Sequence, residues 1–205
     1  MSTDIHYFVF DSLSDWEAAY AIAGINTGQY QRVPDAWRIR TLSPKGEEVT
    51  TAGGLRIRPD MSMMADFDPA DCRLLILPGG TAWDKGEHGD IAVLAGKVLA
   101  AGGAVAAICG ATAGLARAGL LDTVRHTSNA KPYLAATNYK GGALYQEAPA
   151  VTDGRLITAS ATAPVDFAYH IFRELYLFTP QVLDAWYGLF RTGKAEYFAA
   201  LSKAA

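Results

Sequence analysis

The chain has 205 residues, of which 50% are hydrophobic and 19% are charged, and its formal net charge is −3 with a pI near 5.8. This length and composition predict one large domain over 1–205, and the lack of a basic stripe excludes nucleic acid as an expected partner. The apolar stretches are interrupted before 18 residues and the first residues carry no basic segment, so we expect a cytoplasmic protein without a membrane partner.

Apolar and β-prone runs alternate with helical patterns along the chain. The runs that predict buried strands are residues 5–10, 73–77 and 104–108, and residues 37–42 predict a further strand by their alternation. The segments with apolar residues at helical spacing are 12–23, 91–101, 131–136 and 164–178. This alternation is typical of an α/β fold, in which a mostly parallel sheet has helices on both faces.

Several other segments complete the predicted fold. Hairpins are expected over 47–58, around Gly53-Gly54, and over 151–158, around an Asp-Gly turn. Residues 124–128 predict a short strand-like segment. From about 180 the chain continues as an apolar and aromatic helical extension, which either covers the core or forms a dimer contact.

Cys109 lies where the run 104–108 turns through Gly110 into a helical pattern, which is the layout of a nucleophile elbow. Free backbone N–H groups and the dipole at a helix N-terminus favour negative charge, so this position predicts a cysteine with a lowered pKa and a reactive thiolate. The alternative is a buried structural cysteine. The other cysteine, Cys72, is expected only to begin a strand, and we predict no disulfide.

Three predicted features follow strand ends, where ligands bind in open α/β sheets. They are the acidic start of the first helix, with Glu17, the Gly79-Gly80 turn, and the elbow at Cys109. A carboxyl group, backbone N–H groups and a thiol could together form a nucleophile with an oxyanion hole.

Four segments stand out together: Leu77-Pro78-Gly79-Gly80, Ala107-Ile108-Cys109-Gly110-Ala111-Thr112 with residues 115–122 behind it, His126-Thr127-Ser128-Asn129, and Leu156-Ile157-Thr158-Ala159. Through them the chain, from residue 5 to about 177, resembles the ThiJ/PfpI family of the Parkinsonism-associated deglycase and the intracellular peptidase-like proteins. That family lies within the class I glutamine amidotransferase-like superfamily. The resemblance implies a three-layer flavodoxin-like sandwich.

The resemblance also implies roles for single residues. Cys109 matches the reactive cysteine and Glu17 the acidic residue that hydrogen-bonds it, with Asp15 as the rival for that role. We expect Glu17 to be protonated beside the thiolate; its alternative is a glutamate that serves only the helix dipole. The positions whose backbone amides form the anion pocket match Gly79, Gly80 and Gly110.

Further site residues are expected with an alternative for each. His126 aligns approximately with a histidine near the pocket and could act as a base; otherwise it is a histidine at a strand end. Trp16 and Trp83, with Asp15, are candidate pocket walls, or else packing residues. Neither a metal nor an organic cofactor has a motif here.

The chain departs from its relatives in two places. Many of them have a histidine directly after the cysteine, where this chain has Gly110, so the dyad proposed for the peptidase-like members cannot be carried over. Residues 159–164 lack the His-x-Glu of a glutamine amidotransferase. Two hypotheses remain: a glyoxalase-like or deglycase-like hydrolase or lyase that acts on small electrophiles, or an oxidative-stress sensor or chaperone-like protein without turnover. A homodimer is expected, because relatives are commonly dimers.

Overall fold

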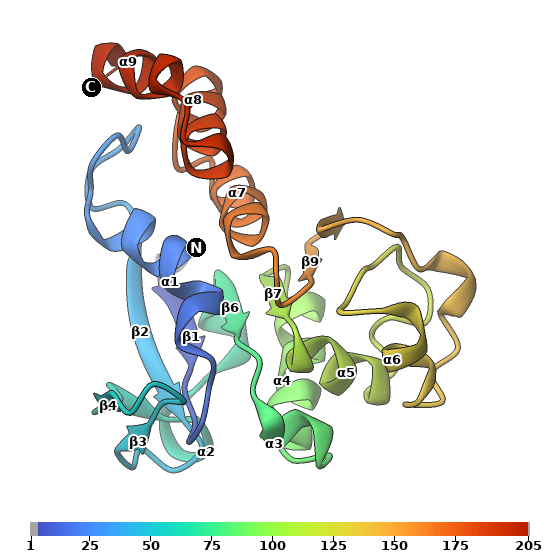
Figure 1. The fold of residues 1–205 in the computed structure, drawn as a ribbon. Coiled ribbons are helices and arrows are strands. Elements are labelled where there is room, and N and C mark those ends of the chain that lie inside the picture. The colour runs from blue at the N-terminus through green and yellow to red at the C-terminus, as the bar shows by residue number, and fades with distance from the viewer. Residues whose placement is uncertain (1–3, 205) are drawn as a thin grey trace.

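The computed structural model of the protein describes residues 4–204, and its centre is a sheet of seven strands in the order β5-β2-β1-β6-β7-β9-β8 (Figure 1). All neighbouring strands are parallel except β8 and β9. The strands are β1 (Asp4–Phe8), β2 (Arg38–Ser43), β5 (Met61–Ser62), β6 (Leu74–Leu77), β7 (Ala104–Ile108), β8 (Ala150–Asp153) and β9 (Leu156–Ala159). Strands β6, β7 and β9 are buried along their whole length, which explains why they are continuous apolar runs.

Helices cover both faces of this sheet. On one face, α1 (Asp15–Asn26) packs against α7 (Pro164–Leu175), and on the other α4 (Gly89–Ala100) packs against α5 (Gly110–Arg117). Connections between parallel strands are right-handed. From β1 the strand order runs toward β2 and β5 on one side and toward β6, β7 and β9 on the other. The helices that connect strands within the two halves of the sheet therefore lie on opposite faces. The structure confirms the predicted three-layer flavodoxin-like sandwich. Short helices fill the connections: α2 (Met63–Asp66), η1 (Pro69–Asp71), α3 (Thr81–Asp84), α6 (Lys131–Ala135) and η2 (Gly142–Leu144).

Both predicted hairpins are present, but the strand expected over 124–128 is not. The first hairpin is a separate antiparallel pair, β3 (Val49–Thr50) with β4 (Arg56–Ile57), and the second is β8 with β9. Within 124–128, only His126 forms an isolated bridge, to Tyr145. The Thr127 N–H donates to the Thr158 hydroxyl at 2.9 Å rather than to a strand backbone, so this segment is tied to β9 by side chains.

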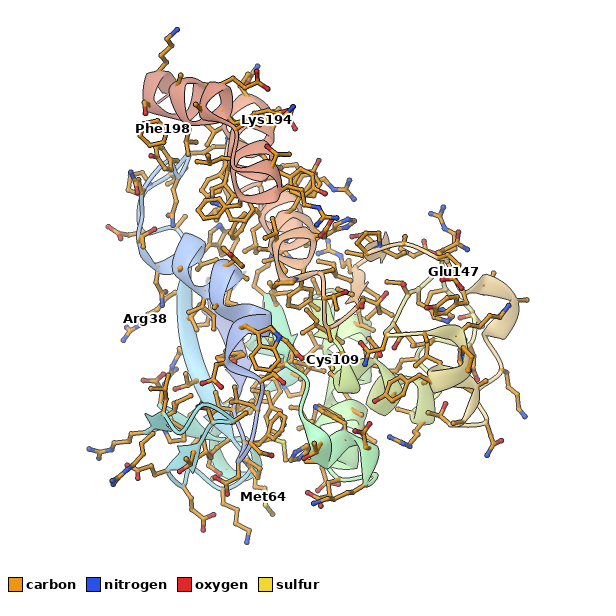
Figure 2. The ribbon with its side chains drawn as sticks, in the orientation of Figure 1. Arg38, Met64, Cys109, Glu147, Lys194 and Phe198 are labelled. Carbon is orange, nitrogen blue, oxygen red and sulfur yellow. The ribbon has the colours of Figure 1, made fainter. Side chains whose placement is uncertain are left out.

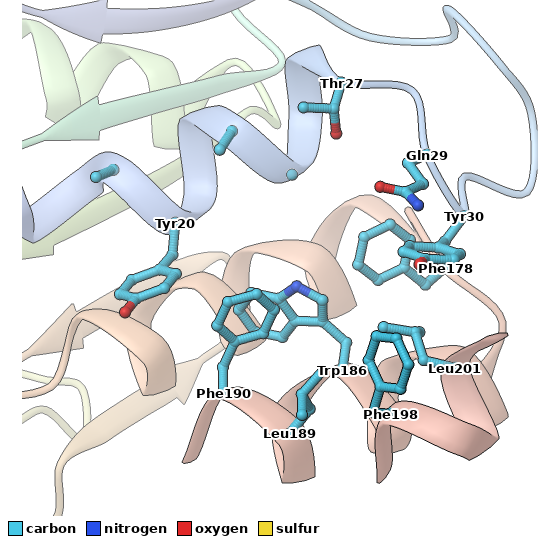
Figure 3. Close-up of a pocket in the computed structure, with 13 residues that line it drawn as sticks. Tyr20, Thr27, Gln29, Tyr30, Phe178, Trp186, Leu189, Phe190, Phe198 and Leu201 are labelled. Carbon is cyan, nitrogen blue, oxygen red and sulfur yellow. The ribbon is translucent and has the colours of Figure 1, made fainter. Parts of the chain in front are cut away.

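The chain ends in two further helices, α8 (Pro180–Thr192) and α9 (Ala195–Ala204), which pack against one another, while α8 also packs on α7. Trp186 of α8 is buried against Phe172 of α7. An aromatic cavity of about 540 Å³ lies between α1 and these helices (Figure 3). Phe190 and Phe198 at its edge remain 45% and 62% exposed, so the extension covers the core and also presents apolar surface. No helix within residues 4–204 is long and apolar enough to cross a bilayer.

Candidate active site

Cys109 occupies the sharp turn between β7 and α5, near the middle of the molecule (Figure 2). Its backbone has φ 57° and ψ −126°, a conformation that costs a residue other than glycine about 1–3 kcal/mol and persists only where its surroundings enforce it. The Cys109 N–H donates to the carbonyl of Ala159 at 3.0 Å, and its carbonyl accepts from the Thr112 hydroxyl at 2.6 Å. These contacts fix the partly exposed thiol at the carboxyl end of the sheet.

Glu17 is the acidic residue that faces the thiol. It lies in the first turn of α1, only 1% exposed, and its Oε2 accepts a 2.5 Å hydrogen bond from the Gly79 N–H. The Ser14 N–H donates in turn to the Gly79 carbonyl at 3.0 Å. Ser14 and Glu17 have the spacing of a capping box, but here the glutamate side chain bonds the turn after β6. This pair of bonds fixes α1 against the Pro-Gly-Gly turn.

Gly79 is the point where the carboxyl and the thiol come together. A Cβ at this position would lie 2.5 Å from Cβ of Cys109, 2.6 Å from Oε2 of Glu17 and 2.8 Å from Sγ of Cys109. Real Cβ atoms essentially never show such contacts. A glycine at position 79 is therefore required for Glu17 and Cys109 to approach one another.

The expected anion pocket is smaller than the sequence suggested. The Gly79 amide is already bonded to Glu17, so it is not free to bind an oxyanion. The Gly80 N–H has no partner among residues 4–204, and the Gly110 amide faces the Cys109 sulfur. Of the three expected amides, those of Gly80 and Gly110 therefore stay candidates for an anion pocket.

Burial controls the protonation of the thiol and the carboxyl. Burial, and after it the charge of Glu17, raise the pKa of Cys109 to about 11, although Asn129 and the Gly110 amide act to lower it. The expected lowering of the thiol pKa by the helix N-terminus is therefore wrong, because burial and the carboxylate outweigh it. Burial also raises the pKa of Glu17, against the hydrogen bond from Gly79. Two anions in contact are disfavoured, so the pair holds one shared proton, and the thiolate forms when that proton lies on Glu17.

Asn129 is a site residue that the sequence reasoning missed. Its Nδ2 donates to Sγ of Cys109 at 3.4 Å, and its Oδ1 accepts from the Ala161 N–H at 2.9 Å. The second bond fixes the carboxamide with its N–H group toward the sulfur. An asparagine cannot carry a proton, so a search for acids and bases passes over it, although it lies within the recognised 126–129 segment.

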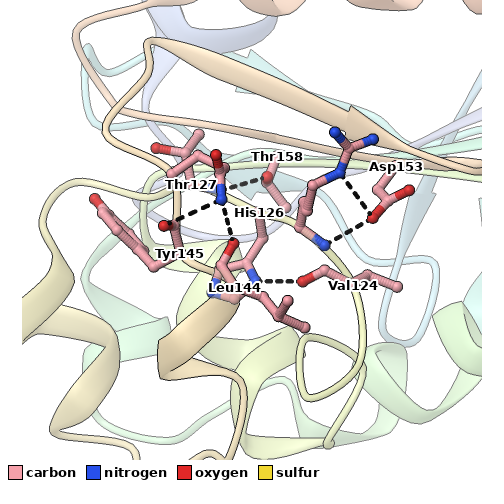
Figure 4. Close-up of polar contacts among 9 residues, drawn as sticks. Val124, His126, Thr127, Leu144, Tyr145, Asp153 and Thr158 are labelled. Carbon is pink, nitrogen blue, oxygen red and sulfur yellow. Dashed lines mark hydrogen bonds and ion pairs between the residues drawn. The ribbon is translucent and has the colours of Figure 1, made fainter.

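His126 does not reach the thiol, contrary to the expected role as a base. Its side chain is fully buried, with Nδ1 2.8 Å from the Val124 carbonyl (Figure 4). Its Nε2 lies 2.9 Å from the Tyr139 hydroxyl. Burial lowers its pKa, so the ring is neutral near pH 7. Both nitrogens are occupied, and His126 holds the 122–145 connection together.

The three expected pocket walls have different roles. Asp15 Oδ2 accepts from the Gly53 N–H at 2.7 Å, which fastens α1 to the hairpin loop and leaves the thiol to Glu17. Trp16, which precedes Glu17 in the sequence, is 58% exposed. Trp83 is fully buried and donates from Nε1 to the Pro78 carbonyl at 2.9 Å. It supports the Pro-Gly-Gly turn from inside the core, so Trp83 is a packing residue, which was the alternative to a pocket wall.

Comparison with known proteins gives the family of this chain. The model of the DJ-1/PfpI family matches residues 4–174. The chain belongs to the DJ-1/PfpI family. It is 42% identical to a Bacillus subtilis protein named "Uncharacterized protease YoaZ", over 96% of this chain and 95% of that protein. The match to the family ends before α8 and α9.

Solved structures of the family have the same fold. A thiJ/pfpI family protein from Bacillus anthracis superposes with a TM-score of 0.92 at 42% identity, over 100% of this chain and 97% of that one. The DJ-1 superfamily protein Atu0886 from Agrobacterium tumefaciens gives 0.82 at 35% identity, over 94% and 99%. In residues 4–204 of the present chain, no three His, Cys, Asp or Glu side chains gather as a metal ion would require.

Proposed function

We propose that this family member is a cysteine-dependent enzyme that consumes small electrophiles, specifically α-dicarbonyls, as a glyoxalase-like or deglycase-like hydrolase or lyase. The observation that carries the proposal is the buried Glu17 carboxyl held by Gly79 beside the Cys109 thiol. A thiol and a carboxyl that share one proton provide a nucleophile and a proton carrier together.

The reaction follows from these groups. Glu17 takes the thiol proton as Sγ bonds to the aldehyde carbon, and the oxygen that gains charge lies at the amides of Gly80 and Gly110. Glu17 returns the proton to that oxygen, which gives a hemithioacetal. A proton then moves from this carbon to the neighbouring carbonyl carbon through Glu17, while the hydroxyl proton of the hemithioacetal passes to the neighbouring carbonyl oxygen, which gives a 2-hydroxy thioester. Water hydrolyses the thioester to a hydroxy acid and restores the thiol, so methylglyoxal plus water becomes lactate.

The names of the relatives as proteases do not transfer to this chain. Peptide cleavage by a cysteine needs a group that protonates the leaving amine, commonly a histidine. All four histidines lie in the described part of the chain, and none has a recorded contact with Cys109. At position 110 even a Cβ would lie 3.0 Å from the Gly80 carbonyl oxygen. The site therefore supports carbonyl chemistry better than peptide hydrolysis.

An oxidative-stress sensor is the second candidate, because the thiol is partly exposed and free while Cys72 is buried. Two peroxide molecules would convert the Cys109 thiol to a sulfinic acid and release two waters. Both functions place the protein in the cytoplasm, where the reducing environment keeps thiols free.

One experiment separates the two candidates. Wild type and Cys109→Ser are treated with graded peroxide, and intact mass and methylglyoxal consumption are measured on the same samples. Methylglyoxal loss that vanishes in Cys109→Ser supports the enzyme. A gain of two oxygens at low peroxide, without methylglyoxal loss by the untreated protein, contradicts the enzyme for that substrate and supports the sensor.

A further inference from the structure

A polar cavity of about 430 Å³ adjoins the thiol and shares one wall with it. That wall is Asn129, whose Nδ2 donates to the Cys109 sulfur and whose Oδ1 accepts from the Ala161 N–H. Ala161 lies in the sequence between two other cavity residues, Ser160 and Thr162. The carboxamide therefore stands between the reactive atom and the cavity. A substrate attached at the sulfur would need to extend past only this side chain to enter the cavity.

The cavity wall is dominated by groups that bind hydroxyls. The side-chain oxygens of Ser160 and Thr162 lie 3.2 Å apart, and each hydroxyl can both donate and accept. Glu147, exposed at another wall, has no recorded partner for its carboxylate among residues 4–204. A pair of hydroxyls and a carboxylate can donate to and accept from a chain of hydroxyl groups on a ligand.

Among the charged side chains of the cavity, Asp166 and Arg191 offset one another, and Glu147 leaves one negative charge. Asp166 is 5% exposed, and its Oδ1 accepts from the Tyr187 hydroxyl at 2.7 Å and lies 3.7 Å from Nε of Arg191. Arg191 is half-exposed and keeps further N–H donors available. Because Arg191 is already paired with Asp166, it offers no unpaired positive charge to an anionic substrate. The cavity fits a neutral polar ligand.

We propose that this cavity binds the hydroxylated tail of a sugar-derived α-oxoaldehyde while its aldehyde carbon reacts at Cys109. The inference rests on the proposed function and names its substrate class. Methylglyoxal has only a methyl group beyond its two carbonyls, so it cannot fill the cavity; a six-carbon compound such as 3-deoxyglucosone places hydroxyls there. Arg191 lies on α8, beyond the match to the family at 4–174, so α8 contributes one wall of a cavity that is otherwise built within that match.

The test compares kcat/KM for 3-deoxyglucosone with kcat/KM for methylglyoxal. We expect a ratio above one in the wild type, and a fall of roughly tenfold in that ratio, mainly through KM, in Arg191→Met and in Thr162→Val. Arg58→Met, an exposed arginine outside the cavity, is the matched control and should keep the wild-type ratio. A ratio below one, or a ratio unchanged in both cavity variants, overturns the inference.

A second readout keeps this inference separate from the proposed function. Cys109-dependent loss of methylglyoxal without preference for 3-deoxyglucosone refutes the cavity assignment alone. If neither compound is consumed, the enzyme proposal fails, and protection of Cys109 from iodoacetamide then decides the cavity. 3-Deoxyglucosone should slow alkylation in the wild type and do so less in Arg191→Met and Thr162→Val. Absence of protection overturns the inference.

Discussion

Replacing Gly79 with alanine tests the contact on which the candidate site depends. The added methyl group would lie 2.5 to 2.8 Å from three atoms of Cys109 and Glu17, all below the 3.0 Å at which something must move. Two of these atoms belong to the reactive pair, Sγ and Oε2. The third is Cβ of Cys109, which the elbow backbone holds in place. The carboxyl and the thiol must therefore separate.

The size of the effect follows from two costs. Overpacking a close-packed site costs about 1–3 kcal/mol, and weakening the Gly79 N–H bond to a buried carboxyl costs about 1.5–3 kcal/mol. The same displacement of the carboxyl and the thiol causes both costs, so they do not add in full. We expect the free energy of unfolding to fall by about 3 kcal/mol, and a domain of this size stays folded after such a loss. A displacement of the reacting groups by about 1 Å lowers kcat roughly 100-fold.

The assay is urea unfolding together with methylglyoxal turnover for Gly79→Ala and for a matched control, Gly142→Ala. Gly142 has no atom within 4 Å of its added Cβ and no left-handed backbone, so the control should match the wild type in both measurements. A Gly79→Ala protein with wild-type stability and turnover would refute the claim that this glycine brings the carboxyl and the thiol together.

Three further predictions concern other parts of the molecule. His126→Ala should lower the free energy of unfolding by about 3 kcal/mol in urea titration yet leave the rate of Cys109 alkylation unchanged, because His126 is buried and bonded elsewhere; a large loss of alkylation would contradict this. Burial lowers the pKa of His170 to about 4, so stability should fall by up to about 3 kcal/mol as the pH drops from 6.5 to 4; His170→Gln should lose that pH dependence in the same titration, and an unchanged slope would count against it. The wild type should sediment as a dimer and Phe198→Asp as a monomer, because Phe198 is exposed on the apolar extension; a wild-type monomer would exclude this.

The layers of the fold could be predicted because the sheet is built from long apolar runs. Burial on both faces leaves β6 and β7 without polar residues, and this pattern can be read without the structure. The strand β5 has only two residues and α3 only four, so neither has a periodicity to recognise. The expected strand at 124–128 failed because side-chain bonds, which have no sequence pattern, hold that segment.

Parts of the site were predictable for a similar reason. Glu17 lies one helical turn before Ala21 and two turns before Ile25, and all three are buried, so this spacing places Glu17 on the buried face of α1. Asp15 is not among the buried residues of this helix. The role expected for His126 followed from the family resemblance and that for Trp83 from residue type, whereas their actual contacts depend on how loops fold back over the sheet. The pKa of Cys109 was misjudged because a position at a helix N-terminus says nothing about how deeply the thiol is buried.

The pH profile of iodoacetamide alkylation tests most directly whether Glu17 and Cys109 share one proton. The alkylation rate is measured by intact mass between pH 5 and 10, in the wild type and in Glu17→Gln. Cys72 is buried, and burial raises its pKa to about 12, so it stays silent. A pair with one proton predicts a wild-type rate with a plateau across neutral pH. Glu17→Gln, which loses the carboxylate charge, should instead rise through a single titration with a pKa below about 11. Identical profiles for the two proteins would contradict the account.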